Sequence, residues 1–147
     1  MRLNRGDIAA LIPHAGAMCL LDGVKEWDST RICCVSRSHL DTGNPLRVNG
    51  TLSALCGIEY AAQAMAVHAG LTGNAKAKPR TGYLASLRDI ECSRDRLDDL
   101  DGDLVVEAER MAGDGLRVMY GFTLWIGRER VLRGRAAVVL DTGDTDA

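Results

Sequence analysis

The sequence predicts an α+β fold in which a curled antiparallel sheet of five to six strands wraps one long central helix. Residues 51–71 form a stretch without proline, lysine or arginine that is rich in alanine and leucine, both of which favour helices. Two segments with strand character precede this stretch and four follow it. Several of these segments are joined by short turns, and short turns connect antiparallel neighbours.

The central helix is expected over Thr51–Leu71, with Thr51 and Ser53 as candidate caps at its start and Gly70 and Gly73 at its end. Apolar residues fall on nearly every side of this helix, so we expect it to be buried all round. It is too short and too polar to cross a membrane. One curled sheet covers such a helix only in part, so we predict a homodimer joined edge to edge, with a mixed pair of related subunits as the alternative.

The other elements follow from local patterns. A short helical turn is expected at residues 6–11, before Pro13. The expected strands are 18–27, 30–38, 81–93, 103–112, 116–126 and 131–140. We interpret residues 1–140 as a single domain and residues 141–147 as an acidic tail that is expected to be disordered.

Composition narrows the classes of function. The formal net charge of −2 argues against a nucleic-acid partner, and 46% hydrophobic with 26% charged residues is typical of a globular protein without a membrane partner. The five cysteines are odd in number and form no CxxC pair, so we expect reduced core thiols in the cytoplasm, without a disulfide or a metal site. The first residues carry no apolar segment suited to a signal peptide.

Glu59 and Gln63 interrupt the apolar run of the helix. They are four residues apart, so the helix should place them on one face with Leu52, Cys56 and Ala66. A carboxylate among apolar side chains is costly unless it is paired, hydrogen-bonded or protonated. Glu59 is therefore the leading candidate for a functional residue, and a structural carboxylate bonded to the backbone is the alternative.

Five short motifs occur in a fixed order along the chain: Ile12-Pro13-His14, Leu20-Leu21-Asp22, the helix motif from Gly57 to Gln63, Tyr83–Leu87 and Gly102-Asp103. With these motifs the chain resembles the β-hydroxyacyl-acyl-carrier-protein dehydratases, and in particular a divergent branch associated with polyene-type pigments. The resemblance implies the hot-dog fold. It also implies dehydration of a 3-hydroxyacyl thioester, on an acyl carrier protein or coenzyme A, to the trans-2-enoyl thioester without a cofactor.

In that family, a histidine in the loop before the helix works with the helix glutamate. Here Asn44-Pro45-Leu46 occupies the corresponding place, and the nearest histidine is His39. The resemblance therefore suggests Glu59 as the acid and His39 as the base, with a solvated loop histidine as the alternative reading of His39. A neutral imidazole suits the base because its ordinary pKa lies near neutrality.

The remaining site candidates would line the substrate. The backbone amides of Ser53, Ala54 and Leu55, at the start of the helix, are candidates to stabilise an enolate oxygen, because the first amides of a helix are unpaired. The predicted substrate-binding residues are His14, Ser53, Ala54, Leu55, Cys56 and Gln63. Gln63 is also a candidate structural partner that orients Glu59, and Cys56 fits a small core residue better than a nucleophile. We interpret His68 as a histidine favoured by the dipole at the helix end.

Two other functions compete with dehydration. On the same scaffold, Glu59 could activate water as an acyl-thioester thioesterase. The absence of the loop histidine also suits a non-catalytic subunit of a heteromeric dehydratase. Arg94, Arg96 and Arg110 are candidates for a basic cluster that meets an acidic carrier protein, and a solvated charged face is the alternative.

Overall fold

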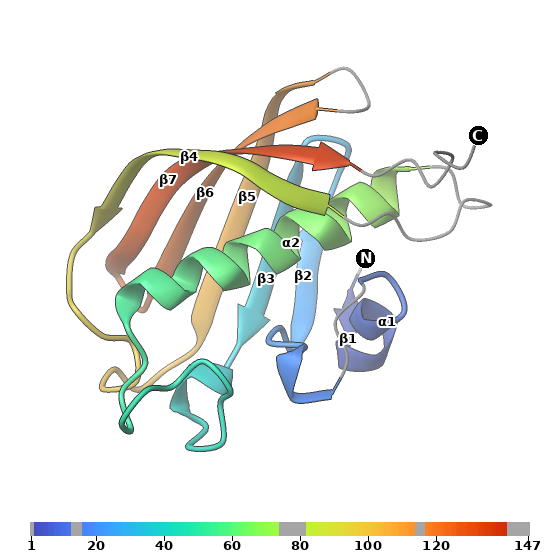
Figure 1. Ribbon diagram of the computed structural model, residues 1–147. Coiled ribbons are helices and arrows are strands. Elements are labelled where there is room, and N and C mark those ends of the chain that lie inside the picture. Colours follow the sequence, from blue (N-terminus) through green and yellow to red (C-terminus); the bar gives the residue numbers. More distant parts are fainter. Residues whose placement is uncertain (1, 13–15, 74–81, 114–116, 141–147) are drawn as a thin grey trace.

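The computed structural model describes residues 2–12, 16–73, 82–113 and 117–140, and it confirms the predicted α+β fold. Within these residues, seven strands form one antiparallel sheet in the order β1-β2-β3-β5-β6-β7-β4, and helix α2 lies across one face of it (Figure 1). The strands are β1 Leu3–Asn4, β2 Gly23–Trp27, β3 Arg31–Ser36, β4 Gly82–Cys92, β5 Leu104–Gly113, β6 Arg117–Ile126 and β7 Glu129–Leu140. The helices are α1 Arg5–Ala9 and α2 Gly57–Thr72, and 3₁₀ turns lie at Gly16–Met18, Ser38–Leu40 and Ala54–Cys56.

The sheet has one strand more than the predicted five to six. The additional strand is β1, in which Leu3 and Asn4 pair antiparallel with Val24 and Gly23. Two residues are too few to show an alternating pattern, so the sequence does not mark them as a strand. The other strands match the predicted segments except at some ends. Strand β2 starts later than Met18, which belongs to a 3₁₀ turn, β5 continues to Gly113 and β7 begins at Glu129.

Helix α2 begins at Gly57, later than the predicted start at Thr51. Thr51 instead pairs with Val48 across a two-residue turn formed by Asn49 and Gly50. The φ angles of these two residues, 53° and 76°, both lie in the left-handed region. A tight hairpin turn of this kind requires such angles, and the Asn-Gly pair tolerates them well.

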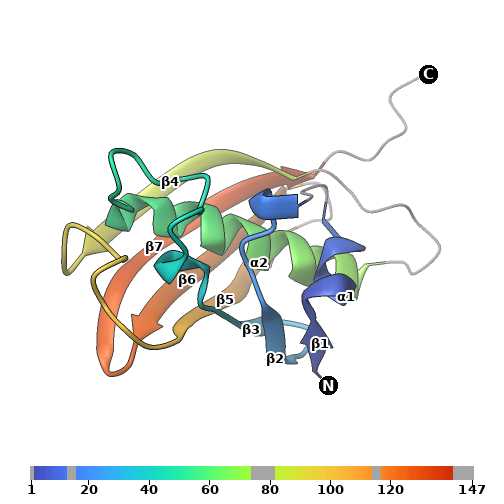
Figure 2. The ribbon, with the colours of Figure 1, turned by 90° about the horizontal axis from the view of Figure 1, so that it is seen from below.

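The sheet curls around α2, so that β2 and the edge strand β4 lie on opposite sides of the helix (Figure 2). Alternate residues of the long strands face the helix and are buried, among them Val106, Ala108, Phe122, Leu124 and Leu132. Gly57 allows the start of α2 to lie directly on β6 and β7. A Cβ atom at this position would stand 2.7 Å from Leu132 and 2.9 Å from Leu124.

The predictions for His14 and for the tail 141–147 fall outside the described residues. Among the helices that the structure describes, none is long and apolar enough to span a membrane. All five cysteines are free. Cys19 and Cys34 are buried as expected, but Cys92 is exposed at the end of β4, so the prediction of a core thiol is wrong there.

Candidate active site around Glu59

The carboxylate of Asp98, in the β4–β5 loop, binds the segment that precedes α2. Its Oδ1 accepts the N–H of Leu52 at 3.0 Å, its Oδ2 lies 3.4 Å from Nη1 of Arg47, and the guanidinium of Arg96 binds both oxygens. The side chain is only 3% exposed, and the bond from Arg96 holds the pKa of Asp98 well below its usual range. The sequence analysis missed this residue, because the charge-rich loop around it gave no sign of which acid is buried.

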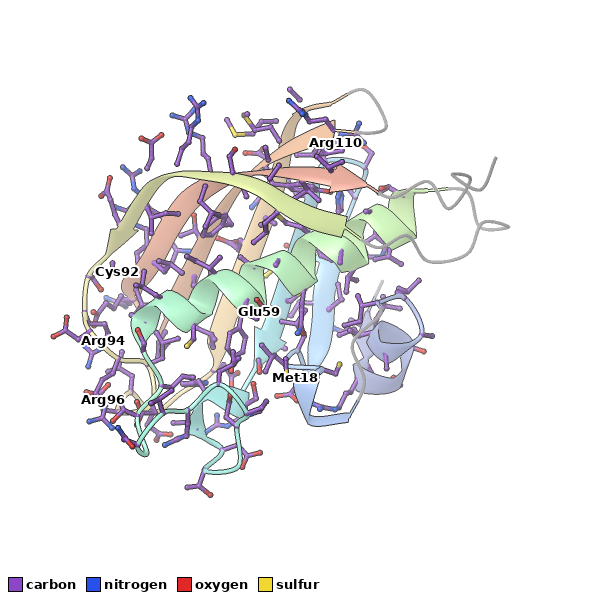
Figure 3. The ribbon with its side chains drawn as sticks, in the orientation of Figure 1. Met18, Glu59, Cys92, Arg94, Arg96 and Arg110 are labelled. Carbon is purple, nitrogen blue, oxygen red and sulfur yellow. The ribbon has the colours of Figure 1, made fainter. Side chains whose placement is uncertain are left out.

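Glu59 lies in the first turn of α2, on the side that faces away from the sheet (Figure 3). Its side chain is half-buried, and its neighbours Ile58, Ala62, Ala66 and Ala69 are partly exposed as well. We call these five residues the open stripe. The single chain therefore leaves the open stripe partly uncovered, as expected if one curled sheet covers the helix only in part. These five residues present one carboxylate, that of Glu59, among apolar side chains.

Gln63 is fully buried, on the side of α2 adjoining Glu59. Its Oε1 accepts the N–H of Leu20 at 2.9 Å, and its Nε2 donates to the carbonyl oxygen of Met18 at 2.6 Å. Residues 18–20 therefore run along the helix beside Glu59 (Figure 3). Gln63 fastens this segment to the helix, and its predicted contact with substrate remains a prediction.

Two of the three backbone amides that were expected to hold an enolate oxygen are already engaged within the chain. Ala54 N–H donates to the carbonyl oxygen of Asp95 at 2.9 Å, and Leu55 N–H donates to the hydroxyl of Ser53 at 3.2 Å. The Ser53 side chain caps only the short 3₁₀ turn before α2, and both Ser53 and Leu55 are exposed. The amide of Leu55 is bonded to an exposed side chain, whereas that of Ala54 is bonded to the backbone.

Cys56 lies half-buried at the junction of the 3₁₀ turn and α2. Burial raises the pKa of its thiol, and the nearby carboxylate of Glu59 raises it further. The thiol therefore stays protonated near neutral pH, and only the thiolate is a strong nucleophile. This arrangement suits a residue that lines the site better than one that attacks a substrate.

The imidazole of His39 is fully buried against the loop that precedes β5. Its Nε2 donates to the carbonyl oxygen of Leu100 at 3.2 Å, since a carbonyl can only accept. Within the described residues, Nδ1 has no hydrogen-bond partner. Burial lowers the pKa of His39, so the ring is neutral near pH 7. His39 is thus a buried neutral imidazole whose Nδ1 accepts no hydrogen bond from the described residues.

Asn44, in the loop before the central helix, is buried in a polar network. Its Nδ2 donates to the carbonyl oxygen of Ser38 at 2.9 Å and to the hydroxyl of Tyr60 at 3.0 Å, while its Oδ1 accepts the N–H of Leu46 at 2.9 Å. The Tyr60 hydroxyl lies 2.7 Å from Oγ of Ser38, and burial raises the pKa of this phenol. Both polar atoms of the Asn44 side chain are therefore committed to holding the fold.

A family model described as ApeP dehydratase matches residues 6–146 of the chain. The chain belongs to the ApeP-like dehydratase family. This confirms the predicted resemblance to a hot-dog dehydratase family. No curated protein matches the chain in sequence.

Solved structures support the fold of this chain. It is similar to the dehydratase heterocomplex ApeI:P from Xenorhabdus doucetiae, with a TM-score of 0.80 and 18% identity over 91% of this chain and 90% of that chain. It is also similar to AziG from S. sahachiroi, with a TM-score of 0.62 and 15% identity over 88% and 97% of the two chains. A mutant thioesterase PA1618 from Pseudomonas aeruginosa gives a TM-score of 0.59 and 11% identity over 80% and 78%. The predicted hot-dog fold is confirmed.

The edge strand β4 leaves its helix-facing side partly uncovered. Leu84 and Leu87 pair with Val138 and Ala136, which are buried on the face that α2 covers. The two leucines are nevertheless 39% and 40% exposed, because α2 packs mainly on β3, β5 and β6. A long edge strand with exposed leucines is a surface that another chain readily pairs with.

The three arginines that were candidates for a basic cluster are not together. Arg94 and Arg96 lie near the start of α2, whereas Arg110 lies at the far end of β5 (Figure 3). Arg94 pairs with Asp99 at 2.9 Å and with Glu129 at 3.5 Å, and Arg96 pairs with the buried carboxylate described above. The predicted cluster is therefore wrong, and the pairing of these guanidinium groups leaves little positive charge for an acidic carrier.

Proposed function

We propose that this chain takes part in the dehydration of a 3-hydroxyacyl thioester, carried on an acyl carrier protein or coenzyme A, to the trans-2-enoyl thioester. The observation that carries the proposal is the placement of Glu59. It is the single ionisable side chain of the open stripe, half-buried among apolar neighbours in a chain of a dehydratase family. An apolar surface with one carboxylate suits an acyl chain whose reacting carbons lie beside that carboxylate.

The reaction needs two proton transfers. A base removes the proton from C2, the released electron pair forms the C2=C3 bond, and the C3–O bond breaks as the hydroxyl takes a proton and leaves as water. Negative charge builds on the thioester oxygen during the first step. The N–H of Leu55 is placed to stabilise that oxygen if it exchanges its bond to Ser53 for one to the substrate.

Glu59 is the proposed acid, and His39 is the first candidate for the base. Nδ1 of His39 has no hydrogen-bond partner among the described residues, which favours this assignment because a neutral imidazole with a free lone pair can accept a proton. The complete burial of the ring means that the loop around it has to move for a substrate to reach it.

A second hot-dog subunit is the other proposed source of the base. Two uncovered surfaces support a subunit partner, the open stripe of α2 and the helix-facing side of β4 with Leu84 and Leu87. A second copy or a related subunit that pairs along β4 would cover both and place its own residues opposite Glu59. In that arrangement, the role of Asn44 is structural and the active site is shared between two chains.

The test is the formation of enoyl thioester from 3-hydroxyacyl coenzyme A and from the carrier-bound substrate, followed by the ultraviolet absorbance of the conjugated product. The purified chain is assayed alone and in complex with a dehydratase-like subunit. We expect Glu59→Gln to lower turnover about 100-fold or more, and Glu26→Gln, at an exposed carboxylate on β2, to leave it unchanged.

Each outcome separates the competing functions. Turnover that is unaffected by Glu59→Gln would sink the proposal. Release of free thiol without enoyl product would identify a thioesterase instead. If only the complex is active and Glu59→Gln in this chain leaves that activity intact, the chain is a non-catalytic subunit. A large loss with His39→Gln in the chain alone would assign the base to His39.

A further inference from the structure

We propose that the outer face of the sheet, over β5, β6 and β7, binds a second copy of this chain face to face. This face is the one opposite α2. It holds a hollow of about 730 Å³, lined by charged side chains of β3, β4, β5 and β7 around a centre of small residues on β6. The proposed contact is separate from the open stripe and does not depend on the activity at Glu59.

The strand register places charges of opposite sign on the two sides of β6. Glu109 on β5 lies opposite Gly121 on β6, and Gly121 lies opposite Arg135 on β7. The next row on the same face repeats this order of acid, small residue and base with Glu107, Thr123 and Arg133. The face therefore carries an acidic column on β5 and a basic column on β7, with β6 between them.

This pattern is self-complementary about one symmetry axis. Consider a twofold axis that runs parallel to β6, midway between two facing sheets. It places β5 of one copy over β7 of the other, and residues keep their position along the strand direction. Glu109 of each copy then faces Arg135 of the other copy. An axis across the strands would instead place acid over acid, so the charges select the first arrangement.

The side chains on this face are able to make the new pairs. Arg135 pairs with Asp89, and Arg133 pairs with Glu91 at 2.7 Å, yet both arginines remain about half exposed. A guanidinium has five N–H donors, so each arginine retains donors for a second carboxylate. Glu109 is exposed, and no ion pair is recorded for it within the part of the chain that the structure describes.

The centre of the face lacks a large side chain, and exposed apolar side chains lie beside it. Gly121 has no side chain, so two facing sheets can approach closely there. Met111 and Met119 flank this position and are 55% and 36% exposed. Methionine side chains adapt their shape to a partner surface, which suits a contact of this kind.

The first test is the assembly size of the purified chain, measured by sedimentation equilibrium over a range of protein concentrations. We expect the face contact to double the mass of the smaller unit and to weaken as salt is added. Glu109→Arg is expected to raise the dissociation constant of this step about tenfold or more. Glu26→Arg, the same change on β2, is the matched control and is expected to leave the constant unchanged.

The second test is a cross-link across the proposed axis. Gly121→Cys is made in a Cys92→Ser background, which removes the exposed native thiol, and is treated with a short bismaleimide. We expect a covalent dimer for this variant and none for Arg128→Cys, in the β6–β7 turn. A Cβ at Gly121 would meet only the flexible sulfur of Met111, at 3.3 Å, so the variant should fold.

The two tests together decide the proposal. A mass that Glu109→Arg leaves unchanged, together with no cross-link at position 121 in a folded variant, would show that this face is a solvated charged surface. The proposal would then be wrong whatever the outcome of the activity assays at Glu59.

Discussion

The imidazole of His68 and the hydroxyl of Tyr120 form a buried hydrogen bond of 2.7 Å, with the two rings edge to face at 87°. The other ring nitrogen, Nε2, lies 2.9 Å from the carbonyl oxygen of Asp28, which can only accept. Nε2 therefore carries the proton, and Nδ1 accepts the hydroxyl proton of Tyr120. One neutral ring thus joins α2, β6 and the β2–β3 turn. The interpretation of His68 as a residue favoured by the helix dipole is wrong, because burial lowers its pKa.

This burial predicts how stability depends on pH. The pKa values of His68 and His39 are both lowered by burial from the ordinary value of 6.5. Between the lowered folded value and 6.5, the unfolded chain binds more protons than the folded chain, so the free energy of unfolding falls as pH falls below 6.5. Each histidine contributes a slope of up to about 1.4 kcal/mol per pH unit. Urea unfolding at a series of pH values between about 7.5 and about 5 measures this slope.

The control for that measurement is the pair of variants His68→Gln and His39→Gln. Each variant is expected to lower the free energy of unfolding at neutral pH. Each should also reduce the slope of that free energy against pH by the contribution of one histidine. A slope that neither variant changes would contradict the assignment of two neutral, buried imidazoles.

Gln63 is predicted to stabilise the segment beside Glu59. Gln63→Met keeps the length of the side chain but leaves the N–H of Leu20 and the carbonyl of Met18 without partners. Because unpaired buried polar groups are costly, we expect the free energy of unfolding to fall by about 2–4 kcal/mol. Urea unfolding measures the change, and Ala69→Gln on the open stripe, expected within about 0.5 kcal/mol of wild type, is the control. A loss equal to that of the control would argue against the fastening role.

Asp98, in the β4–β5 loop, is predicted to be the acid whose loss most destabilises the segment before α2. Asp98→Asn leaves two guanidinium groups without their buried carboxylate, so we expect a loss of about 3 kcal/mol in the free energy of unfolding. The folded pKa of Asp98 lies below the ordinary value of 3.8, so its stabilisation is present above 3.8 and is lost as pH falls towards the folded value. Chemical denaturation at about pH 7 and about pH 3 checks both statements.

The neighbouring residue provides the control for Asp98. Asp99 pairs with Arg94 but is 41% exposed, and exposed ion pairs contribute only about 0–1 kcal/mol. Equal losses for Asp98→Asn and Asp99→Asn would show that burial does not distinguish the two acids.

The Asn49-Gly50 turn is predicted to depend on glycine. Gly50 has a φ of 76°, where a side chain is strained, so Gly50→Ala is expected to cost about 1–2 kcal/mol of unfolding free energy. Gly43→Ala is the matched control, because Gly43 has no positive φ and a Cβ there makes an ordinary contact of 3.4 Å with Asp41. Thermal unfolding of both variants measures the difference, and an equal effect would contradict the proposed strain.

The amino-acid sequence by itself determined the elements and the family. The alternation of residues 116–126 and the alanine-rich run around Glu59 are local patterns, so the long strands and the central helix could be predicted from them. The hot-dog arrangement was implied by the resemblance of several short motifs to a known family. A two-residue strand such as β1 and the start of α2 at Gly57 could not, because distant pairing and turn geometry set them.

Only the tertiary structure decided what the polar residues do. Gln63 bonds to a residue 43 positions away and His68 to one 52 positions away, and no periodicity reports a partner at such separations. The same holds for the open stripe, since the composition of α2 suits burial on all sides and only the path of the curled sheet shows which side it leaves uncovered. Hydrogen bonding and burial depend on which chain segments meet in space, and that information is not local in the sequence.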